Sequence, residues 1–346
     1  MRIYLTTILL FLFCFCAVAQ KQGERFAQSY ALLDAMLNNE AEYSFKDAVF
    51  SVENAYLDGK LDKTEFEKEI SVYVNLCNSL LKNRLLEYGE KDRETVNKWA
   101  AVFTVMTDSI PLYIQDEQYV YTPFSYDFKD VFGHHDKENL FVSKLLKTRK
   151  GNCRSLPYLY KILAEELEVN ANLALAPNHV YIKHNSERHG WYNTELTSGI
   201  FPIDAWIMTS GFVHVDAITN GVYMKALNNK ESIAVLLVDL AENYNAKFPD
   251  NDGSFALQCA ERAIKEYPNF AKALILKAEA NKVQWQNETD EKKKKQMLTD
   301  LENQLAHIHN LGYRQMPEEM YLNWLVSLKT EREKYENKNL NNFIKN

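Results

Sequence analysis

The chain has 346 residues, 25% of them charged, and a formal net charge of −7 at pH 7. That length leaves room for two or three compact units, and a mildly acidic chain without a basic patch is a poor candidate for nucleic-acid binding. With only 11 glycines and 8 prolines there is little linker material. We therefore expect the units to pack on one another.

Residues 1–19 have the pattern of a secretory signal peptide. Arg2 precedes an apolar run over 8–18, and Ala17–Ala19 supplies a small-x-small cleavage pattern. The run is too short for a good membrane span, and Cys14 and Cys16 follow phenylalanines where a bacterial lipid-attachment site would need a small residue. We expect cleavage and export, giving a periplasmic or secreted protein without stable membrane insertion.

Three cysteines remain after removal of this leader: Cys77, Cys153 and Cys259. Three thiols in a chain of this length do not make a disulfide framework. An odd number also leaves at least one thiol free unless a bridge forms between molecules. A reactive cysteine would account for that free thiol.

Residues 20–135 are predicted to form an N-terminal helical region. Apolar residues recur there at the spacing of amphipathic helices, among them Leu33, Met36, Phe45, Ala48, Val49, Val52, Phe66, Leu76, Leu80, Trp99, Phe103 and Met106. Residues 113–137 are aromatic and irregular, and we expect their rings to fill a seam between packed units or to line a cleft. No catalytic motif occurs in this region.

A histidine pair near the end of this region raises the question of a metal. His134 and His135 are adjacent, and Asp136 follows them. Adjacent side chains on a strand point to opposite sides, and no cysteine or carboxylate cluster at ligand spacing accompanies the pair. We predict a solvated loop and no metal site.

Residues 136–228 are predicted to form an α+β core around a cysteine. Apolar residues at helical spacing begin just after Gly151 and Asn152, so a helix should start within a residue or two of Cys153. Unpaired N–H groups and the positive end of the helix dipole favour the thiolate, which is the reactive form. The same N–H groups can hold an oxyanion.

Three strands are predicted after this helix, and they carry the partners of the thiol. Residues 171–176 and 179–184 alternate around a Pro-Asn turn, and 191–197 should pair back on the second strand. His179 opens the second strand. Asn193 and Glu195 are two residues apart, so both side chains leave the same face of the third strand. Either one can orient the imidazole in a nucleophile, base and orienter arrangement.

These motifs resemble those of the transglutaminase-like superfamily, a branch of the papain-type cysteine fold. Its motifs are a Cys opening a helix, a His opening a strand, and an acid in a following W-x-x-x-D-x-T-type strand. Trp191, Glu195 and Thr197 fit the last motif with Glu in place of Asp. The match covers residues 140–197. It implies a Cys-carrying helix packed on a small antiparallel sheet, and cysteine-dependent chemistry without a cofactor.

Two further residues on the third strand and beyond remain open as orienting groups. The longer Glu195 side chain must fold back to reach the imidazole, so Asn193 remains an alternative, as an Asn does in papain-like enzymes. Asp204 lies off the motif and ranks third. Residues 201–216 should be strand-like or loop segments bounded by glycines.

Residues 229–346 are predicted to be helical and similar to tetratricopeptide repeats, with small residues where paired helices touch. The residues that carry this pattern are Leu240, Ala241, Tyr244, Ala256, Ala263, Pro268 and Ala278. The remainder, through Leu301, Ile308, Tyr321 and Trp324, is amphipathic and should cap the stack. Such repeats form concave surfaces for protein partners, and a purely structural helical cap fits the pattern as well.

Two functions from different classes follow from the sequence. In the first, the protein is a thiol acyl transferase or peptidase that acts on peptide or amide bonds through Cys153, His179 and Glu195 or Asn193. In the second, it is a catalytically inactive protein of the same fold that serves as a peptide- or protein-binding module in the cell envelope. Neither requires a metal or a cofactor.

Overall fold

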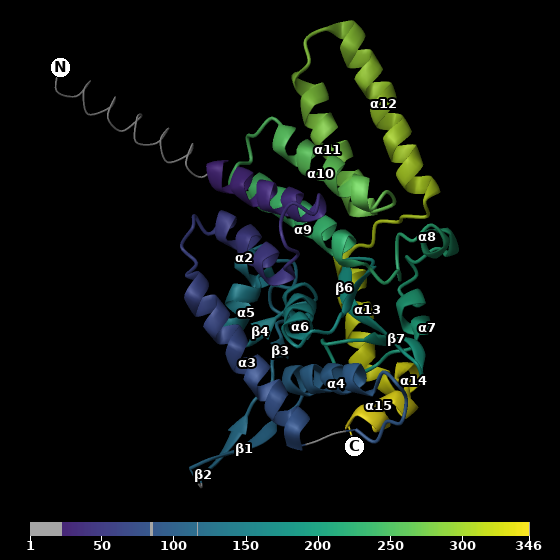
Figure 1. The fold of residues 1–346 in the computed structure, drawn as a ribbon. Helices are drawn as coiled ribbons and strands as arrows, with labels where there is room; N and C mark the ends of the chain where they lie inside the picture. The colour runs from purple at the N-terminus through teal and green to yellow at the C-terminus, as the bar shows by residue number, and fades with distance from the viewer. Residues whose placement is uncertain (1–22, 84–85, 116, 346) are drawn as a thin grey trace, which may run out of the picture.

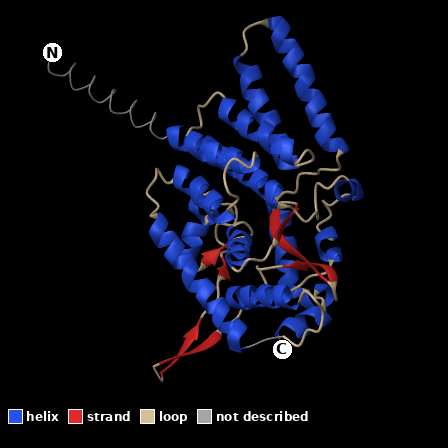
Figure 2. Ribbon diagram, viewed as in Figure 1, coloured by secondary structure: helices blue, strands red, loops and turns tan. Residues whose placement is uncertain are grey.

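The computed structural model describes residues 23–83, 86–115 and 117–345, so the predicted signal peptide lies outside the described residues. The chain is α+β, as predicted. Helices make up most of the described part, together with small sheets of two or three strands (Figure 2).

The N-terminal region is helical, as predicted. Its helices, in chain order, are one over 23–37, α2 (Phe45–Tyr56), α3 (Lys63–Asn83) and α4 (Arg93–Thr107). α2 begins where Ser44 accepts a hydrogen bond from the Asp47 N–H, and it buries the apolar face that the periodicity indicated. α4 is buried over most of its length because it packs against both α3 and α6.

The aromatic segment that follows is partly regular, which differs from the prediction. β1 (Ile110–Ile114) and β2 (Glu117–Tyr121) form an antiparallel hairpin, seen at the lower left of Figure 1. Two-residue strands β3 (Ser125–Tyr126) and β4 (Lys150–Gly151) then pair in parallel. A 3-10 helix, η1 (Lys137–Leu140), and α5 (Val142–Thr148) lie between them.

The predicted helix and three strands are present in the core. They are α6 (Ser155–Glu166), β5 (Asn172–Ala176), β6 (His179–Ser186) and β7 (Gly190–Thr194), and the antiparallel sheet has the order β5-β6-β7. The third strand is shorter than predicted. It ends at Thr194, and Glu195 instead forms a single antiparallel bridge with Ile200.

Short helices follow where strand-like segments were expected. They are α7 (Asp204–Met208) and α8 (Val215–Thr219). Trp206 and Ile207 of α7 are buried, and that packing outweighs the local preference for a strand or loop. The strand-like prediction for residues 201–216 was therefore wrong at α7 and α8.

Long helices form the next region: α9 (Asn229–Lys247), α10 (Ser254–Glu266), α11 (Ala271–Asn287) and α12 (Glu291–Asn310). Each packs on the next, and buried alanines such as Ala256, Ala260 and Ala263 let the helices approach closely. α9 is central, because it also packs on α2 and β5. The helix over 23–37 lies beside it, and the Phe26 ring contacts that of Tyr244 (Figure 1).

The last helices do not cap this stack, contrary to the prediction. α13 (Glu318–Thr330), α14 (Arg332–Tyr335) and α15 (Lys338–Lys345) return to the core, and α13 runs beside β6 and α7 in Figure 1. Tyr321 and Trp324 are buried in one hydrophobic cluster with Trp206. Pro202 bridges to Glu336 on the same side. The aromatic face of α13 finds more apolar surface on the core than on the polar α12.

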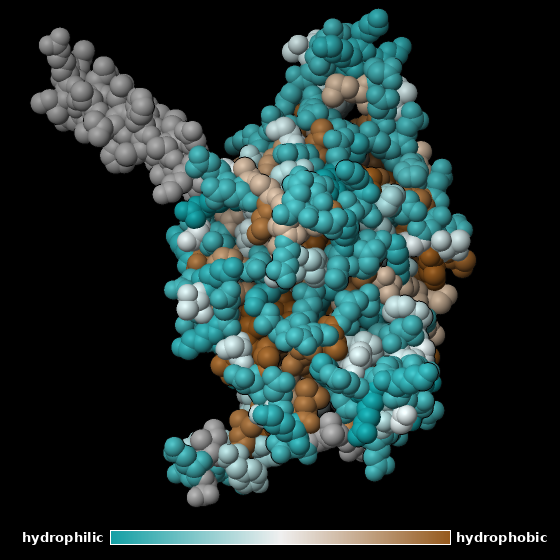
Figure 3. Space-filling view, viewed as in Figure 1, coloured by the Kyte–Doolittle hydropathy of each residue, from teal (hydrophilic) through white to brown (hydrophobic). Residues whose placement is uncertain are grey.

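The described part of the chain contains no helix that is long and apolar enough to cross a membrane. The face seen in Figure 3 is mostly hydrophilic, with hydrophobic side chains in small separate areas.

Candidate active site

Cys153 lies two residues before the first residue of α6, in a turn that is fixed by hydrogen bonds to Asn152. The carboxamide oxygen of Asn152 accepts hydrogen bonds from the N–H groups of Arg154 (2.9 Å) and Ser155 (3.1 Å). A Cβ at Gly151 would lie 2.6 Å from Ser155 Oγ, so only glycine fits there. The thiol is half-buried and donates to the carbonyl of Asn178 (3.6 Å). The sulfur is thus fixed and still reachable.

His179 opens β6, and both of its ring nitrogens are hydrogen-bonded. Nε2 lies 2.6 Å from Glu195 Oε2, and Nδ1 lies 3.1 Å from the Tyr321 hydroxyl. The other Glu195 oxygen accepts the N–H of Thr197 (2.8 Å). The side chains of His179 and Glu195 are 0% and 2% exposed. The carboxylate therefore fixes the plane of a fully buried imidazole.

The three groups shift one another's protonation. Burial raises the pKa of the Cys153 thiol, but hydrogen bonding to His179 and the positive charge there lower it to a net value below the usual range. Burial lowers the pKa of His179, but the Glu195 carboxylate and Cys153 raise it to about 10. Burial raises the pKa of Glu195, but the interaction with His179 lowers it by more, so the net pKa lies below the usual value. The site favours a thiolate beside an imidazolium.

Asn193 does not orient the imidazole, which corrects one of the two predicted alternatives. Its Nδ2 donates to Pro202 O (3.0 Å) and to Asp204 Oδ1 (2.8 Å). The register pairs Asn193 with Lys183, four residues beyond His179, which is about 13 Å along a strand at about 3.3 Å per residue. Glu195 lies two residues closer to His179. The structure brings Cys153, His179 and Glu195 together and leaves Asn193 outside.

Asp204, the third candidate, is also away from the imidazole. Its carboxylate accepts from Asn193 and lies 3.8 Å from Lys183 Nζ. Its side chain is 60% exposed. It serves the start of α7 and not the thiol.

Sequence reasoning missed the aromatic cover of the site. The Trp324 and Trp206 rings are stacked with their centroids 4.2 Å apart. Both lie edge-to-face with the His179 ring, at centroid distances of 5.4 Å for Trp324 and 5.9 Å for Trp206. Tyr321, one turn before Trp324, supplies the hydroxyl at Nδ1. The only sequence signal was the spacing of Tyr321 and Trp324 on one helical face, which does not reveal what that face covers.

A second missed residue is Tyr126 in the short strand β3. It pairs with Gly151, two residues before the cysteine. Its hydroxyl lies 3.5 Å from that of Tyr321. The parallel pairing of β3 with β4 therefore places a second phenol at the site.

Arg154 forms a second, partly buried cluster of charges, and its own charge also helps to lower the pKa of the Cys153 thiol. Its guanidinium lies 3.0 Å from Asp239 and 3.3 Å from Glu242 of α9. Tyr158 donates to Asp239 (2.7 Å), and Lys272 lies 2.6 Å from Glu242. This cluster ties the Cys-carrying helix to α9.

Among the described residues, no group of three or more His, Cys, Asp or Glu side chains has the arrangement of a metal site. The histidine pair lies in a loop, where Asp130 accepts the backbone N–H groups of His134, His135 and Asp136. His134 Nε2 lies 2.8 Å from Glu318 Oε1. This contact links the loop to the start of α13.

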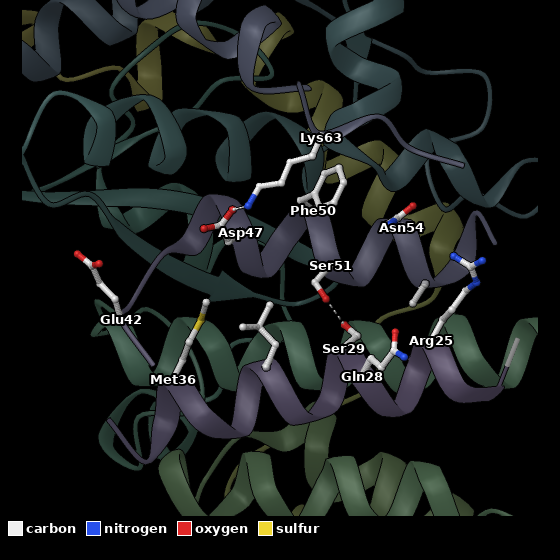
Figure 4. Close-up of a pocket in the computed structure, with 12 residues that line it drawn as sticks. Arg25, Gln28, Ser29, Met36, Glu42, Asp47, Phe50, Ser51, Asn54 and Lys63 are labelled. Carbon is white, nitrogen blue, oxygen red and sulfur yellow. Dashed lines mark hydrogen bonds and ion pairs between the residues drawn. The ribbon is translucent and has the colours of Figure 1, made fainter. Parts of the chain in front are cut away.

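A pocket elsewhere in the molecule has a different character. It has a volume of about 440 Å³ and lies between the helix over 23–37 and α2 (Figure 4). Ser29 bonds to Ser51 across it, and Lys63 pairs with Asp47 at its side. No cysteine or histidine lines it. It is therefore separate from the thiol chemistry.

Comparison with known proteins identifies no relative: no family model, no curated protein and no solved structure matches the chain. Function is therefore inferred from the geometry of the site. A partly buried thiol of lowered pKa, beside an imidazole held by a carboxylate, has the parts needed to attack an electrophilic carbon and to move a proton.

Proposed function

We propose that the protein is a cysteine-dependent acyl transferase or peptidase of the transglutaminase-like type. The observation that carries the proposal is the 2.6 Å contact between His179 Nε2 and Glu195 Oε2, made by an imidazole that also hydrogen-bonds to Cys153 and lowers the pKa of its thiol. Orienter, base and nucleophile then follow one another in the required order. The expected signal peptide over residues 1–19 would direct this activity outside the cytoplasm.

The reaction proceeds in two halves. The Cys153 thiolate attacks the carbonyl carbon of a peptide or amide, a C–S bond forms, and the π electrons move to oxygen. When the C–N bond breaks, the His179 imidazolium gives its proton to the leaving amine. Water or a second amine then attacks the thioester, gives a proton to neutral His179, and the thiolate leaves.

Glu195 has a specific part in this cycle. As a carboxylate it stabilises the imidazolium, which in turn keeps the thiolate formed. A neutral amide in its place would fix the ring but not the charge. The buried position of the pair strengthens this attraction, because screening by water is weak there.

One observation supports the second candidate, an inactive binding module. His179 is fully buried beneath Tyr321 and Trp324, so a substrate must approach Cys153 from its exposed side or displace α13. If neither occurs, the fold serves for binding only. The two candidates predict opposite behaviour of the thiol toward substrates.

A thiol-reactivity assay with matched variants separates the candidates. Iodoacetamide should label wild-type Cys153 at pH 6.5 at least tenfold faster than in His179→Ala, as followed by mass spectrometry. Cys77 and Cys259 are fully buried, and burial raises the pKa of each, so they serve as internal references for intact folding. Equal labelling in wild type and variant would exclude the activated nucleophile.

Turnover needs its own test, since a reactive thiol alone does not establish an enzyme. Peptide, amide and cell-wall cross-link substrates should be screened against wild type and Cys153→Ala. Product formation that depends on Cys153 supports the enzyme, and retention of an unprocessed peptide by both proteins supports the binding module.

A further inference from the structure

An attack by Cys153 requires hydrogen-bond donors for the oxyanion that forms on the substrate carbonyl. The N–H groups at the start of α6 were expected to supply them. Those of Arg154 and Ser155 donate to Asn152 Oδ1, and that of Leu156 donates to Asn152 O (3.2 Å). The helix cap therefore uses these donors internally. Among the described residues the Cys153 N–H makes no such bond and can serve as one donor, so a side chain must supply the second.

Each side chain near the Cys153 sulfur can serve as the second donor only if its N–H or O–H hydrogen does not already bind a group other than the sulfur. Asn178 Nδ2 donates to Met316 O (2.8 Å). The indole N–H of Trp324 donates to Trp206 O (2.9 Å), and that of Trp206 donates to Ser327 Oγ (3.2 Å). The Tyr321 hydroxyl is bound to His179 Nδ1. The carboxamide and indole hydrogens are therefore committed to other groups, and the Tyr321 hydroxyl is held between the imidazole and the sulfur.

Tyr126 remains, and the backbone holds it in place. β3 and β4 pair in parallel with Tyr126 opposite Gly151, and the Asp127 N–H donates to Gly151 O (2.7 Å). The phenol lies at the site, since its oxygen is 3.5 Å from that of Tyr321. That distance is at the long limit of a hydrogen bond, and the Tyr126 hydroxyl also bonds to the Cys153 sulfur, so it lies beside the atom that attacks the carbonyl.

We propose that the Tyr126 hydroxyl is a catalytic residue that donates a hydrogen bond to the oxyanion formed when Cys153 attacks a carbonyl. The assignment rests on the proposed acyl-transfer function and deepens it. As the C–S bond forms, the carbonyl π pair moves to oxygen and receives this hydrogen bond. As the C–N bond breaks, the pair returns, and Tyr126 keeps its proton throughout.

The surroundings keep the phenol protonated, as this role requires. Burial, with the negative charge of Cys153, raises the pKa of Tyr126 well above its usual value. Removal of one oxyanion donor in other enzymes costs about 10²–10³ in kcat. A hydroxyl that also contacts Tyr321 should give an effect toward the lower end.

Two reactions of the same thiol test the proposal. Acylation by p-nitrophenyl acetate passes through an oxyanion, whereas alkylation by iodoacetamide does not. In Tyr126→Phe we expect acylation to slow about tenfold to a hundredfold, with alkylation within about threefold of wild type. Tyr119→Phe is the matched control, because Tyr119 is exposed on β2 and its hydroxyl donates to Glu117, away from the site.

The outcomes separate this assignment from the proposed function. If Tyr126→Phe slows both reactions by one factor, the phenol acts on the thiolate and the oxyanion role is wrong. If it slows neither, the assignment is also wrong. If wild type reacts no faster than His179→Ala in both reactions, the proposed function itself fails. Because Phe keeps the ring, thermal melting should match wild type within a few degrees and confirm folding.

Discussion

Two clusters of charged groups are built around the neighbouring residues Cys153 and Arg154, and they contact different elements of the fold. Cys153 meets His179, which is held by Glu195. Arg154 meets Asp239 and Glu242 on α9. Both clusters remove charges from water, which is costly unless partners compensate. The two clusters differ in whether their groups can change protonation state.

The Arg154 cluster holds fixed charges. Burial lowers the pKa of Arg154, but the two carboxylates raise it to a net value above its usual range. Burial raises the pKa of Glu242, but Lys272 and Arg154 bring it well below the usual range. In the Cys153 cluster a single proton can sit on the sulfur or the imidazole, and Cys153 is not fully buried. The first arrangement supports a framework, and the second supports chemistry.

Removal of His179 should give the largest effect. In His179→Ala, turnover should fall about a thousandfold or more, because both the thiolate and the proton donor are lost. Stability should change less than activity. Cys153→Ala gives the background rate. A variant that keeps more than a tenth of wild-type turnover would contradict the assignment of the base.

Removal of Arg154 should act on stability instead. Arg154→Met leaves Asp239 and Glu242 without their common partner, and loss of one member of a buried pair costs about 3–5 kcal/mol. Urea unfolding should show this loss, while Cys153 alkylation at a temperature where the protein is folded stays within about threefold. If Arg154→Met left the stability unchanged and strongly slowed Cys153 alkylation, Arg154 would act on the reactive thiol and not on the framework.

The identity of the orienting group can be measured with a pair of variants. Glu195→Gln should slow turnover about tenfold to a thousandfold, since a neutral amide does not stabilise the imidazolium. Asn193→Ala should slow it no more than about threefold, because Asn193 bonds to Pro202 and Asp204. The reverse order of effects would make the amide the orienter.

A smaller effect is expected from Glu53, which lies near Asp239. Burial raises its pKa to about 7, although the N–H groups of Val142 and Ser143 donate to it. The folded state then binds a proton more tightly than the unfolded state, so stability rises as pH falls from about 7 toward 4.5. We expect a gain of about 1–3 kcal/mol at 1.36 kcal/mol per pKa unit. Chemical unfolding of Glu53→Gln should lose this slope, and an unchanged slope would exclude Glu53 as its source.

The sequence predicts those parts that depend on local pattern. Periodicity indicates α6 and the three strands, and the alternation of the third strand favours Glu195 or Asn193 over Asp204 as the partner of His179. The choice between them depends on strand register, which the sequence does not specify. The β1–β2 hairpin was missed because Gln115, at φ +49°, occupies a turn position that usually signals itself with glycine.

Other features depend on contacts between distant residues. Tyr321 and His179 are 142 residues apart, and Arg154 and Glu242 are 88 apart. An amphipathic face shows that a helix is buried but not against what. The predicted cap on the helical stack was right for α12, whose Leu301 and Ile308 are buried where it packs on α11, and wrong for α13, because the core offers α13 the aromatic surface of Trp206.

The pH dependence of Cys153 alkylation tests the central claim most directly. A thiolate stabilised by His179 should react with iodoacetamide at a nearly constant rate from below pH 7 to about pH 10, where His179 loses its proton. Turnover should decline through about pH 10, as the proton donor is lost. A single rise in alkylation with a midpoint at about 8.5, that of an ordinary thiol, would contradict the thiolate–imidazolium pair.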